Sequence, residues 1–231
     1  MTTLRAGLIG IGMMGRNHAR VLRALDGVEL VGVVDPGGDT YQAASGIPLL
    51  ASLEELVSLG IDYAVVSIPT AHHLDAGVAL AGAGVHCLIE KPVADSAEGA
   101  QVLVSAFESA GLVGAVGHIE RYNPALQHAR ARLANGELGE VYQIVTRRQG
   151  PFPGRISDVG VVKDLGTHDV DLTAWVTQRD YRSVSAHVAH RSGRDHEDLV
   201  AVVGELEGGS VANHLVNWLS PLKERITVIT G

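Results

Sequence analysis

The sequence has little cysteine and no long apolar run, and each shortage excludes a class of protein. Its 231 residues contain one cysteine, Cys87, so no disulfide forms within the chain and a reducing, cytoplasmic compartment is expected. No apolar stretch approaches the roughly 20 residues that span a bilayer, so no membrane partner is expected. The first expected strand begins at Leu4, which leaves no room for a signal peptide.

Positive charge is also scarce. The chain has 18 Lys and Arg residues against 26 Asp and Glu, a formal net charge of −8, and its longest basic cluster is Arg147-Arg148. This balance argues against a nucleic-acid partner. The run His196-Glu197-Asp198 lacks the H-E-x-x-H spacing of a zinc helix, and we predict no structural or catalytic metal.

What the sequence does contain is a glycine-rich turn near its N-terminus. An apolar strand is expected over Leu4–Ile9, then the turn, then a helix in which Val21, Leu22 and Leu25 are apolar at positions i, i+1 and i+4. In such a unit the first glycine permits positive φ, the second lets a pyrophosphate approach the backbone, and the third lets the helix pack against the strand. The helix N-terminus then presents N–H groups to the phosphates. We therefore predict a dinucleotide-binding turn made of Gly10, Ile11, Gly12, Met13, Met14 and Gly15.

Asp35 completes this pattern at the end of a second apolar strand, Val28–Val34. It lies 35 − 15 = 20 positions after Gly15, where a carboxylate accepts hydrogen bonds from the ribose hydroxyls of an adenosine. The carboxylate would repel a 2′-phosphate, and the following Pro36-Gly37-Gly38 supplies no cation, so NAD is favoured over NADP. The alternative is an ordinary strand–helix–strand turn with an acid at a strand end.

Strands and helices continue to alternate up to Gly117, which predicts a doubly wound parallel sheet. Gly10, Asp35, Pro69 and Lys91 all fall at carboxyl ends of strands, where such sheets bind ligands. After residue 118 the pattern changes to a helix from Pro124, a helix over about Gly166–Thr177 and several strands, the last from Arg225. We predict an α/β protein with a Rossmann domain at 1–118 and, at 119–231, an α+β domain with a mostly antiparallel sheet.

Two places could carry catalysis. Lys91 follows a buried strand beside Glu90, where an ammonium could stabilise an alkoxide, but a lysine there could equally be a surface group at a strand end. Asp164 and His168 are four residues apart, which on a helix places a carboxylate and an imidazole on one face, as a general base and its orienting acid require. The alternative is a helix-capping aspartate and an interior histidine with structural hydrogen bonds.

The combination of motifs resembles the Gfo/Idh/MocA (glucose–fructose oxidoreductase/inositol dehydrogenase) family. The resemblance rests on G-I-G-M-M-G at 10–15, V-V-D at 33–35, I-P-T-A-H-H at 68–73, E-K-P at 90–92 and D-L-G-T-H-D at 164–169. It implies an NAD-dependent dehydrogenase acting on the CH–OH group of a sugar, nucleotide sugar or cyclic polyol. It also implies a homo-oligomer formed through the open sheet of the second domain, since such a face needs cover.

The resemblance implies roles for individual residues. The catalytic set would be Lys91, Asp164 and His168, and the residues along the cofactor would include Ser67, Pro69, Thr70, His73, Glu90 and Lys91. A narrower likeness, carried by G-H-I-E-R-Y-N-P-A at 117–125 and D-V-G-V-V-K-D-L-G-T-H-D-V-D at 158–171, points to members that oxidise nucleotide sugars, the UDP-N-acetylglucosamine 3-dehydrogenase-like subgroup. Arg121, Tyr122 and Asn123 would then border the sugar.

One departure from the family keeps other functions open. The chain stops at Gly231, earlier than family members usually do, so the second domain is expected to be shortened. A truncated enzyme or a non-catalytic dinucleotide sensor is one alternative, and an inositol or glucose dehydrogenase rather than a nucleotide-sugar enzyme is another. A protein that binds a different nucleotide or SAM on the same fold is the third.

Overall fold

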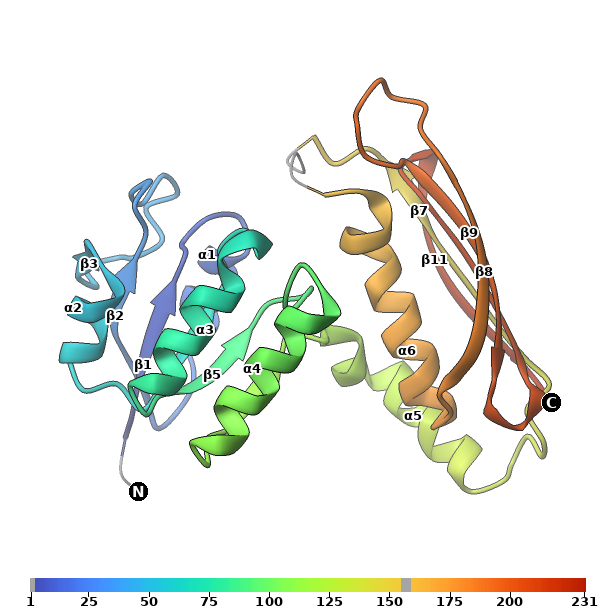
Figure 1. The fold of residues 1–231 in the computed structure, drawn as a ribbon, viewed down its shortest axis with the longest axis horizontal. Helices are drawn as coiled ribbons and strands as arrows, with labels where there is room; N and C mark the ends of the chain where they lie inside the picture. The colour runs from blue at the N-terminus through green and yellow to red at the C-terminus, as the bar shows by residue number, and fades with distance from the viewer. Residues whose placement is uncertain (1–2, 155–158) are drawn as a thin grey trace. The chain divides into compact units, whose positions relative to one another are not determined.

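The computed structural model describes residues 3–154 and 159–231, so Asp158, the first residue of the 158–171 motif, lies outside the described part. The chain divides into two compact units, Met1–Gly117 and His118–Gly231. Figure 1 shows a sheet with helices in each of them. Within the described residues, no helix is long and apolar enough to cross a membrane.

The first unit is a six-stranded, all-parallel sheet with the strand order β3-β2-β1-β4-β5-β6. Its strands are β1 (Leu4–Ile9), β2 (Val28–Val34), β3 (Leu49–Leu50), β4 (Tyr63–Val66), β5 (His86–Ile89) and β6 (Gly114–Val116). Its helices are α1 (Gly15–Leu22), α2 (Leu53–Ser58), η1 (Thr70–His72), α3 (His73–Gly82) and α4 (Ala97–Ser109). The predicted doubly wound parallel sheet is confirmed.

Both faces of this sheet are covered, because successive side chains of a strand point to opposite faces. Ile9 packs with residues of α2, α3 and α4, such as Leu56, whereas Leu8 packs with residues of α1, such as Leu22. The strand order reverses between β1 and β4, so the loops after these two strands diverge and leave the crevice in which such sheets bind ligands. The glycine-rich turn follows β1 at this point.

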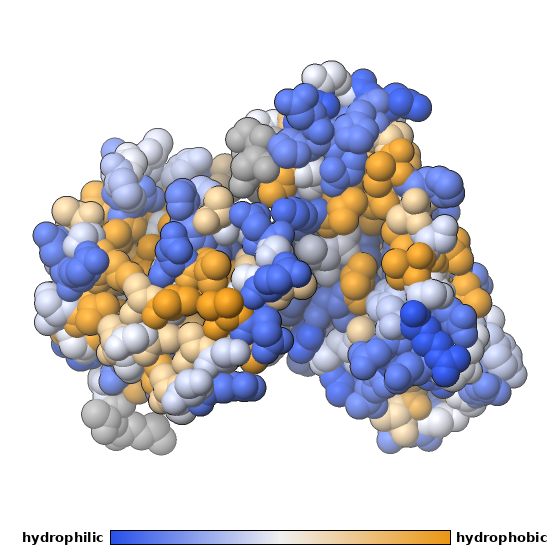
Figure 2. All heavy atoms as spheres, viewed as in Figure 1, coloured by the Kyte–Doolittle hydropathy of each residue, from blue (hydrophilic) through white to orange (hydrophobic). Residues whose placement is uncertain are grey.

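Of the apolar residues noted in the helix after the turn, Leu22 is buried in α1, and Leu25 lies after the last residue of that helix. Gly15, Ala19 and Leu22 are its buried residues, whereas Val21 and Leu25 are 42% and 48% exposed. The close packing of Gly15 on the turn fixes which side of the helix meets the sheet, and residues four and seven positions later share that side. Figure 2 shows other apolar side chains at the surface of this unit, over α3 and α4.

The second unit is a five-stranded sheet with the order β11-β7-β10-β9-β8, in which only β7 and β10 run parallel. Its strands are β7 (Gln143–Pro151), β8 (Tyr181–Ala189), β9 (Leu199–Leu206), β10 (Val211–Asn217) and β11 (Leu219–Thr230). Its helical segments are η2 (Ile119–Tyr122), α5 (Pro124–Ala134), η3 (Val162–Gly166), α6 (Thr167–Thr177) and η4 (Glu207–Gly209). The mostly antiparallel sheet predicted for this part is confirmed.

The helices of the second unit lie on one side of its sheet (Figure 1). The core between them contains Val200, Val216 and Trp218 of the sheet side and Val161, which precedes η3. The other face of the sheet carries Val203, Val211, Ile226 and Val228, which are 38–52% exposed. This outer face therefore carries exposed apolar side chains in the single chain, together with polar ones such as Arg147 and Asn213.

Candidate active site

The glycine-rich turn after β1 needs each of its three glycines for a different reason. Gly10 has φ +87°, and a Cβ there would lie 2.6 Å from the carbonyl oxygen of Ser67. A Cβ on Gly15 would lie 2.0 Å from the carbonyl oxygen of Gly10, so the start of α1 packs directly on the turn. A Cβ on Gly12 would meet nothing within 4 Å. Gly12 therefore has no steric role in the fold, and its missing side chain leaves backbone open to a ligand.

Asp35, directly after β2, is held beside this turn. Its Oδ2 accepts a hydrogen bond from the N–H of Ile11 at 2.8 Å, and its Oδ1 accepts one from the N–H of Gly37 at 2.8 Å. Each carboxylate oxygen accepts more than one hydrogen bond, so capacity remains for a hydroxyl ligand. Within the described chain, α1 has no side-chain N-cap and no acid in its first turn, which leaves the positive end of the helix for an anion.

The residues after β4 mostly contact backbone. The Ser67 hydroxyl donates to the Gly10 carbonyl at 2.9 Å and so joins the end of β4 to the glycine-rich turn. Thr70 is buried at the start of η1, which Pro69 precedes. His73 is 1% exposed, and its Nδ1 and Nε2 lie 2.9 Å from the carbonyl oxygens of Pro92 and Ile68. His73 therefore links the segment after β4 to the segment after β5.

Glu90 and Lys91 follow β5. The Glu90 side chain is buried, with its Oε1 2.8 Å from Nε2 of His18 and its Oε2 accepting the N–H of Lys91 at 3.2 Å. Burial would raise the pKa of Glu90, but the hydrogen bond and charge of His18 and the Lys91 N–H hold that pKa below its ordinary value. Glu90 is therefore a carboxylate fixed between α1 and the lysine of E-K-P.

In the second unit, Asp164 and His168 lie on one continuous helical run. Asp164 is in η3, a π-helix, and His168 is in the first turn of α6, which continues it. Asp164 is 7% exposed, and its N–H donates to the Gly160 carbonyl at 3.1 Å. A π-helical turn is uncommon and frequently marks a functional site.

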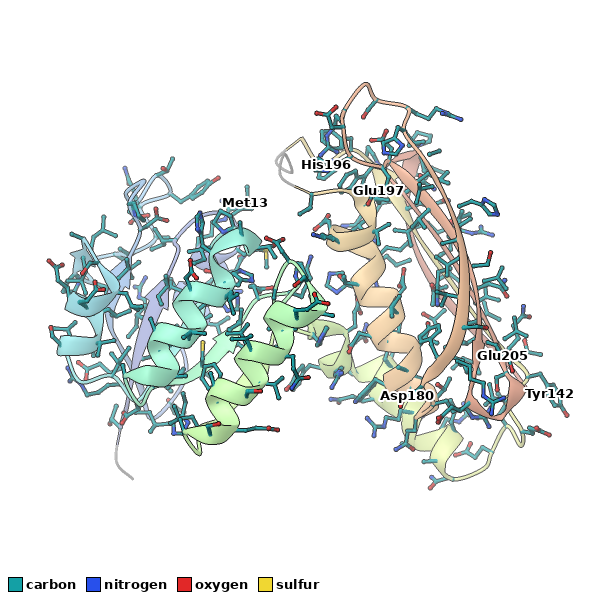
Figure 3. All side chains as sticks on the ribbon, in the orientation of Figure 1. Met13, Tyr142, Asp180, His196, Glu197 and Glu205 are labelled. Carbon is teal, nitrogen blue, oxygen red and sulfur yellow. The ribbon has the colours of Figure 1, made fainter. Side chains whose placement is uncertain are left out.

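Three contacts fix this helical run to the rest of the unit. The Val162 N–H, at its start, donates to Oε1 of Glu197 at 2.9 Å. Figure 3 shows Glu197 in the loop beside that end of the helix. In the first turn of α6, Asp169 pairs with Arg148 of β7 at 3.0 Å, and Arg148 also pairs with Glu120 at 2.8 Å. These contacts hold the segment that carries Asp164 and His168.

The third contact of the helical run, after Val162–Glu197 and Asp169–Arg148, is made by Arg121, one of the predicted substrate residues. The Arg121 guanidinium donates to both oxygens of Asp171 on α6, which raises the pKa of Arg121. Asn123 caps α5 by accepting the N–H of Ala125 at 3.1 Å, and Tyr122 between them is 77% exposed. Arg121, Tyr122 and Asn123 are all exposed residues.

Sequence reasoning missed two residues of this arrangement. His18 is 72 positions from its partner Glu90. The sequence feature that could have pointed to it is its place three residues after Gly15, in the first turn of the helix. Glu197 was considered as a metal ligand and instead caps a helix through Val162. Among the described residues, no group of three or more His, Cys, Asp and Glu side chains could hold a metal ion.

Two family models match the chain. Residues 4–118 match the oxidoreductase family model with an NAD-binding Rossmann fold, and residues 126–231 match the GFO/IDH/MocA C-terminal domain. The UDP-N-acetylglucosamine 3-dehydrogenase of Acidithiobacillus ferrooxidans is 33% identical over 215 residues, which are 92% of this chain and 66% of that protein. An inositol 2-dehydrogenase of Cereibacter sphaeroides is 34% identical, over 85% of this chain and 61% of its own length. The chain thus spans less than two thirds of these curated relatives.

Solved structures agree over the whole chain. GenD2 from gentamicin A biosynthesis, in complex with NAD, superposes with a TM-score of 0.93 at 28% identity and covers 100% of this chain and 70% of its own. The WlbA dehydrogenase from Bordetella pertussis, in complex with NADH and UDP-GlcNAcA, gives a TM-score of 0.92 at 25% identity, with 100% and 72% covered.

Proposed function

The chain belongs to the Gfo/Idh/MocA oxidoreductase family, and on that premise we propose that it is an NAD-dependent dehydrogenase that oxidises a CH–OH group of a sugar. One observation carries this proposal. The glycine-rich turn, Asp35 and Lys91 follow three strands of one parallel sheet and therefore lie at the same edge of it.

The residues present fit NAD. The open backbone at Gly12 and the uncapped start of α1 suit a pyrophosphate, and Asp35 suits an unmodified ribose. Pro36-Gly37-Gly38, directly after Asp35, offers no cation for a 2′-phosphate, which disfavours NADP. The remaining residues proposed to contact the cofactor are Ile11, Met13, Met14, Ser67, Pro69, Thr70, His73, Glu90 and Lys91.

The nicotinamide, when bound, supplies a hydride acceptor. The protein's own residues do the rest in this proposal. His168 accepts the proton of the substrate hydroxyl, and the Lys91 ammonium stabilises the negative charge that develops on that oxygen. Asp164, on the same helical run, orients the histidine. Arg121, Tyr122 and Asn123 border the sugar.

We propose a nucleotide sugar as the substrate. The 117–125 and 158–171 motifs and the similarity to a UDP-N-acetylglucosamine 3-dehydrogenase support it. The inositol 2-dehydrogenase relative keeps a cyclic polyol as the comparison substrate. In this account the first unit holds the cofactor and the second provides the substrate-binding sheet.

The outer face of the second sheet supports a homo-oligomer. Val203, Val211, Ile226 and Val228 lie on that face and are exposed in the single chain, and covering them with a second copy would remove apolar area from water. Light scattering of the wild type against Val203→Lys tests this, and the substitution should lower the mass. Cys87 is buried and unpaired, and we propose the reducing cytoplasm as the protein's compartment.

The function is tested in two steps. NADH is titrated by fluorescence, and then NADH production from NAD is screened with UDP-N-acetylglucosamine, UDP-glucose and myo-inositol. Binding followed by turnover on a sugar supports the dehydrogenase, whereas binding without turnover on any of them leaves a dinucleotide sensor. SAM is titrated as the control, and binding of SAM in place of NADH would contradict both.

A further inference from the structure

A cleft in the second unit brings two cations next to Asp164. It has a volume of about 330 Å³ and lies between η3 and the edge strand β11. Asp164 of η3 lines it together with Lys223 and Arg225 of β11. Leu165, Pro151, Pro153 and Trp218 give it an apolar wall. The cleft therefore combines a surface suited to a ring with a charged rim.

The net charge of the residues that line this cleft is opposite in sign to the net charge of the whole chain. The protein carries a formal net charge of −8, yet two cations and one carboxylate line this cleft. Neighbouring arginines already have carboxylate partners, since Arg148 pairs with Glu120 and Asp169, and Arg147 pairs with Glu224. Among the described residues, Lys223 and Arg225 make no ion pair within 4.0 Å.

The surroundings of Arg225 favour a further anion. Burial lowers the pKa of Arg225, and the like charge of Arg148 lowers it further. The negative charges of Glu120, Asp169 and Asp164 act in the opposite direction but do not fully offset this decrease. The cationic form is thus less stabilised here than in water. A negative group placed against Arg225 would offset that loss.

On these grounds, and resting on the proposed dehydrogenase function, we infer that Lys223 and Arg225 form an anion subsite that binds the diphosphate of a nucleotide sugar. A guanidinium donates two parallel hydrogen bonds to a phosphate, and an ammonium acts beside it as a point charge. Two cations match the two negative charges of a diphosphate diester better than the single charge of a uronic acid. A neutral polyol would bring no negative charge to Lys223 and Arg225, so this rim favours a nucleotide sugar over the inositol alternative.

Direct binding of UDP tests the subsite without relying on turnover. Calorimetry with UDP is carried out on the wild type, Lys223→Ala, Arg225→Gln and the double variant. Each single substitution should weaken UDP binding about tenfold, the loss expected for one hydrogen bond to a charged group. Arg182→Gln is the matched control, because Arg182 is an exposed strand arginine on β8, paired with Glu205, outside the cleft.

Turnover adds a second, independent readout. With NAD saturating, the Lys223 and Arg225 variants should raise KM for UDP-N-acetylglucosamine about tenfold while the affinity for NADH is unchanged. Unchanged UDP affinity in the double variant would overturn the subsite. The subsite would also be overturned if substituting both cations weakened the binding of glucuronate but did not weaken the binding of UDP. If no sugar is oxidised at all, the proposed function fails, and the UDP titration still decides the subsite.

Discussion

Nε2 of His18 and Oε1 of Glu90 lie 2.8 Å apart, and this contact joins the helix after the glycine-rich turn to the strand end that carries Lys91. The other Glu90 oxygen accepts the Lys91 N–H at 3.2 Å. One buried carboxylate thus links the proposed pyrophosphate site to the proposed catalytic lysine. His18 is in this account a positioning residue that acts through Glu90.

Replacing His18 tests that link. His18→Ala leaves a buried carboxylate oxygen without its donor, which should lower the free energy of unfolding by about 1–3 kcal/mol and raise KM for NAD severalfold. His18→Gln keeps an N–H donor and should restore most of both. Urea unfolding and NADH titration are the measurements. If the alanine variant matched the wild type in KM for NAD, His18 would have no positioning role.

Substitutions at Gly12 and Gly15 distinguish an effect on ligand binding from an effect on folding. A Cβ on Gly12 meets nothing within 4 Å, so Gly12→Ala should leave the free energy of unfolding within about 0.5 kcal/mol of wild type. The added methyl occupies the approach of the pyrophosphate, and NADH affinity should fall at least about tenfold. Gly15→Ala is the contrast, because its Cβ would lie 2.0 Å from the Gly10 carbonyl oxygen. That variant should be destabilised, and equal NADH affinity of Gly12→Ala and wild type would contradict the site.

His214 gives the second unit a pH-dependent stability. It is 3% exposed, its Nδ1 lies 2.7 Å from the Thr146 hydroxyl and its Nε2 lies 2.7 Å from the Tyr181 hydroxyl. Burial lowers the pKa of His214 from 6.5 to about 4. The unfolded chain therefore binds a proton between these values that the folded chain does not, and stability falls as pH drops from 6.5 towards 4.

The expected loss from His214 is about 2 kcal/mol between pH 7.5 and pH 5. Urea unfolding at the two pH values measures it. His214→Gln keeps a polar side chain of similar size but does not titrate, so its unfolding free energy should change less between the two pH values. An equal change in both proteins would remove His214 as the source.

Local signals predicted the first unit well. A short stretch of sequence encodes the backbone conformation of the glycines and the burial of the apolar strands. These local patterns, with Asp35 at a strand end, were therefore sufficient to predict the parallel sheet. Residue type alone did not distinguish Leu22, which is buried in α1, from Val21 and Leu25, which are exposed. The packing of Gly15 on the Gly10 carbonyl decides which side of α1 is buried.

The second unit depends more on contacts between distant residues. The sequence predicted the last strand from Arg225, whereas β11 begins at Leu219 and passes through Pro221. An edge strand with an irregular register tolerates proline, because the missing N–H need not pair. The π-helical turn at Asp164 and its cap by Glu197 have no local signal, since the partner lies 35 residues away.

The most direct test of the central claim is the turnover of His168→Ala. With NAD and UDP-N-acetylglucosamine, the wild type should produce NADH, and the variant should bind NADH as tightly while kcat falls by about 10²–10⁴. Lys91→Met, which removes the ammonium proposed to stabilise the alkoxide, should also lower kcat. Turnover by His168→Ala at the wild-type rate would contradict the account.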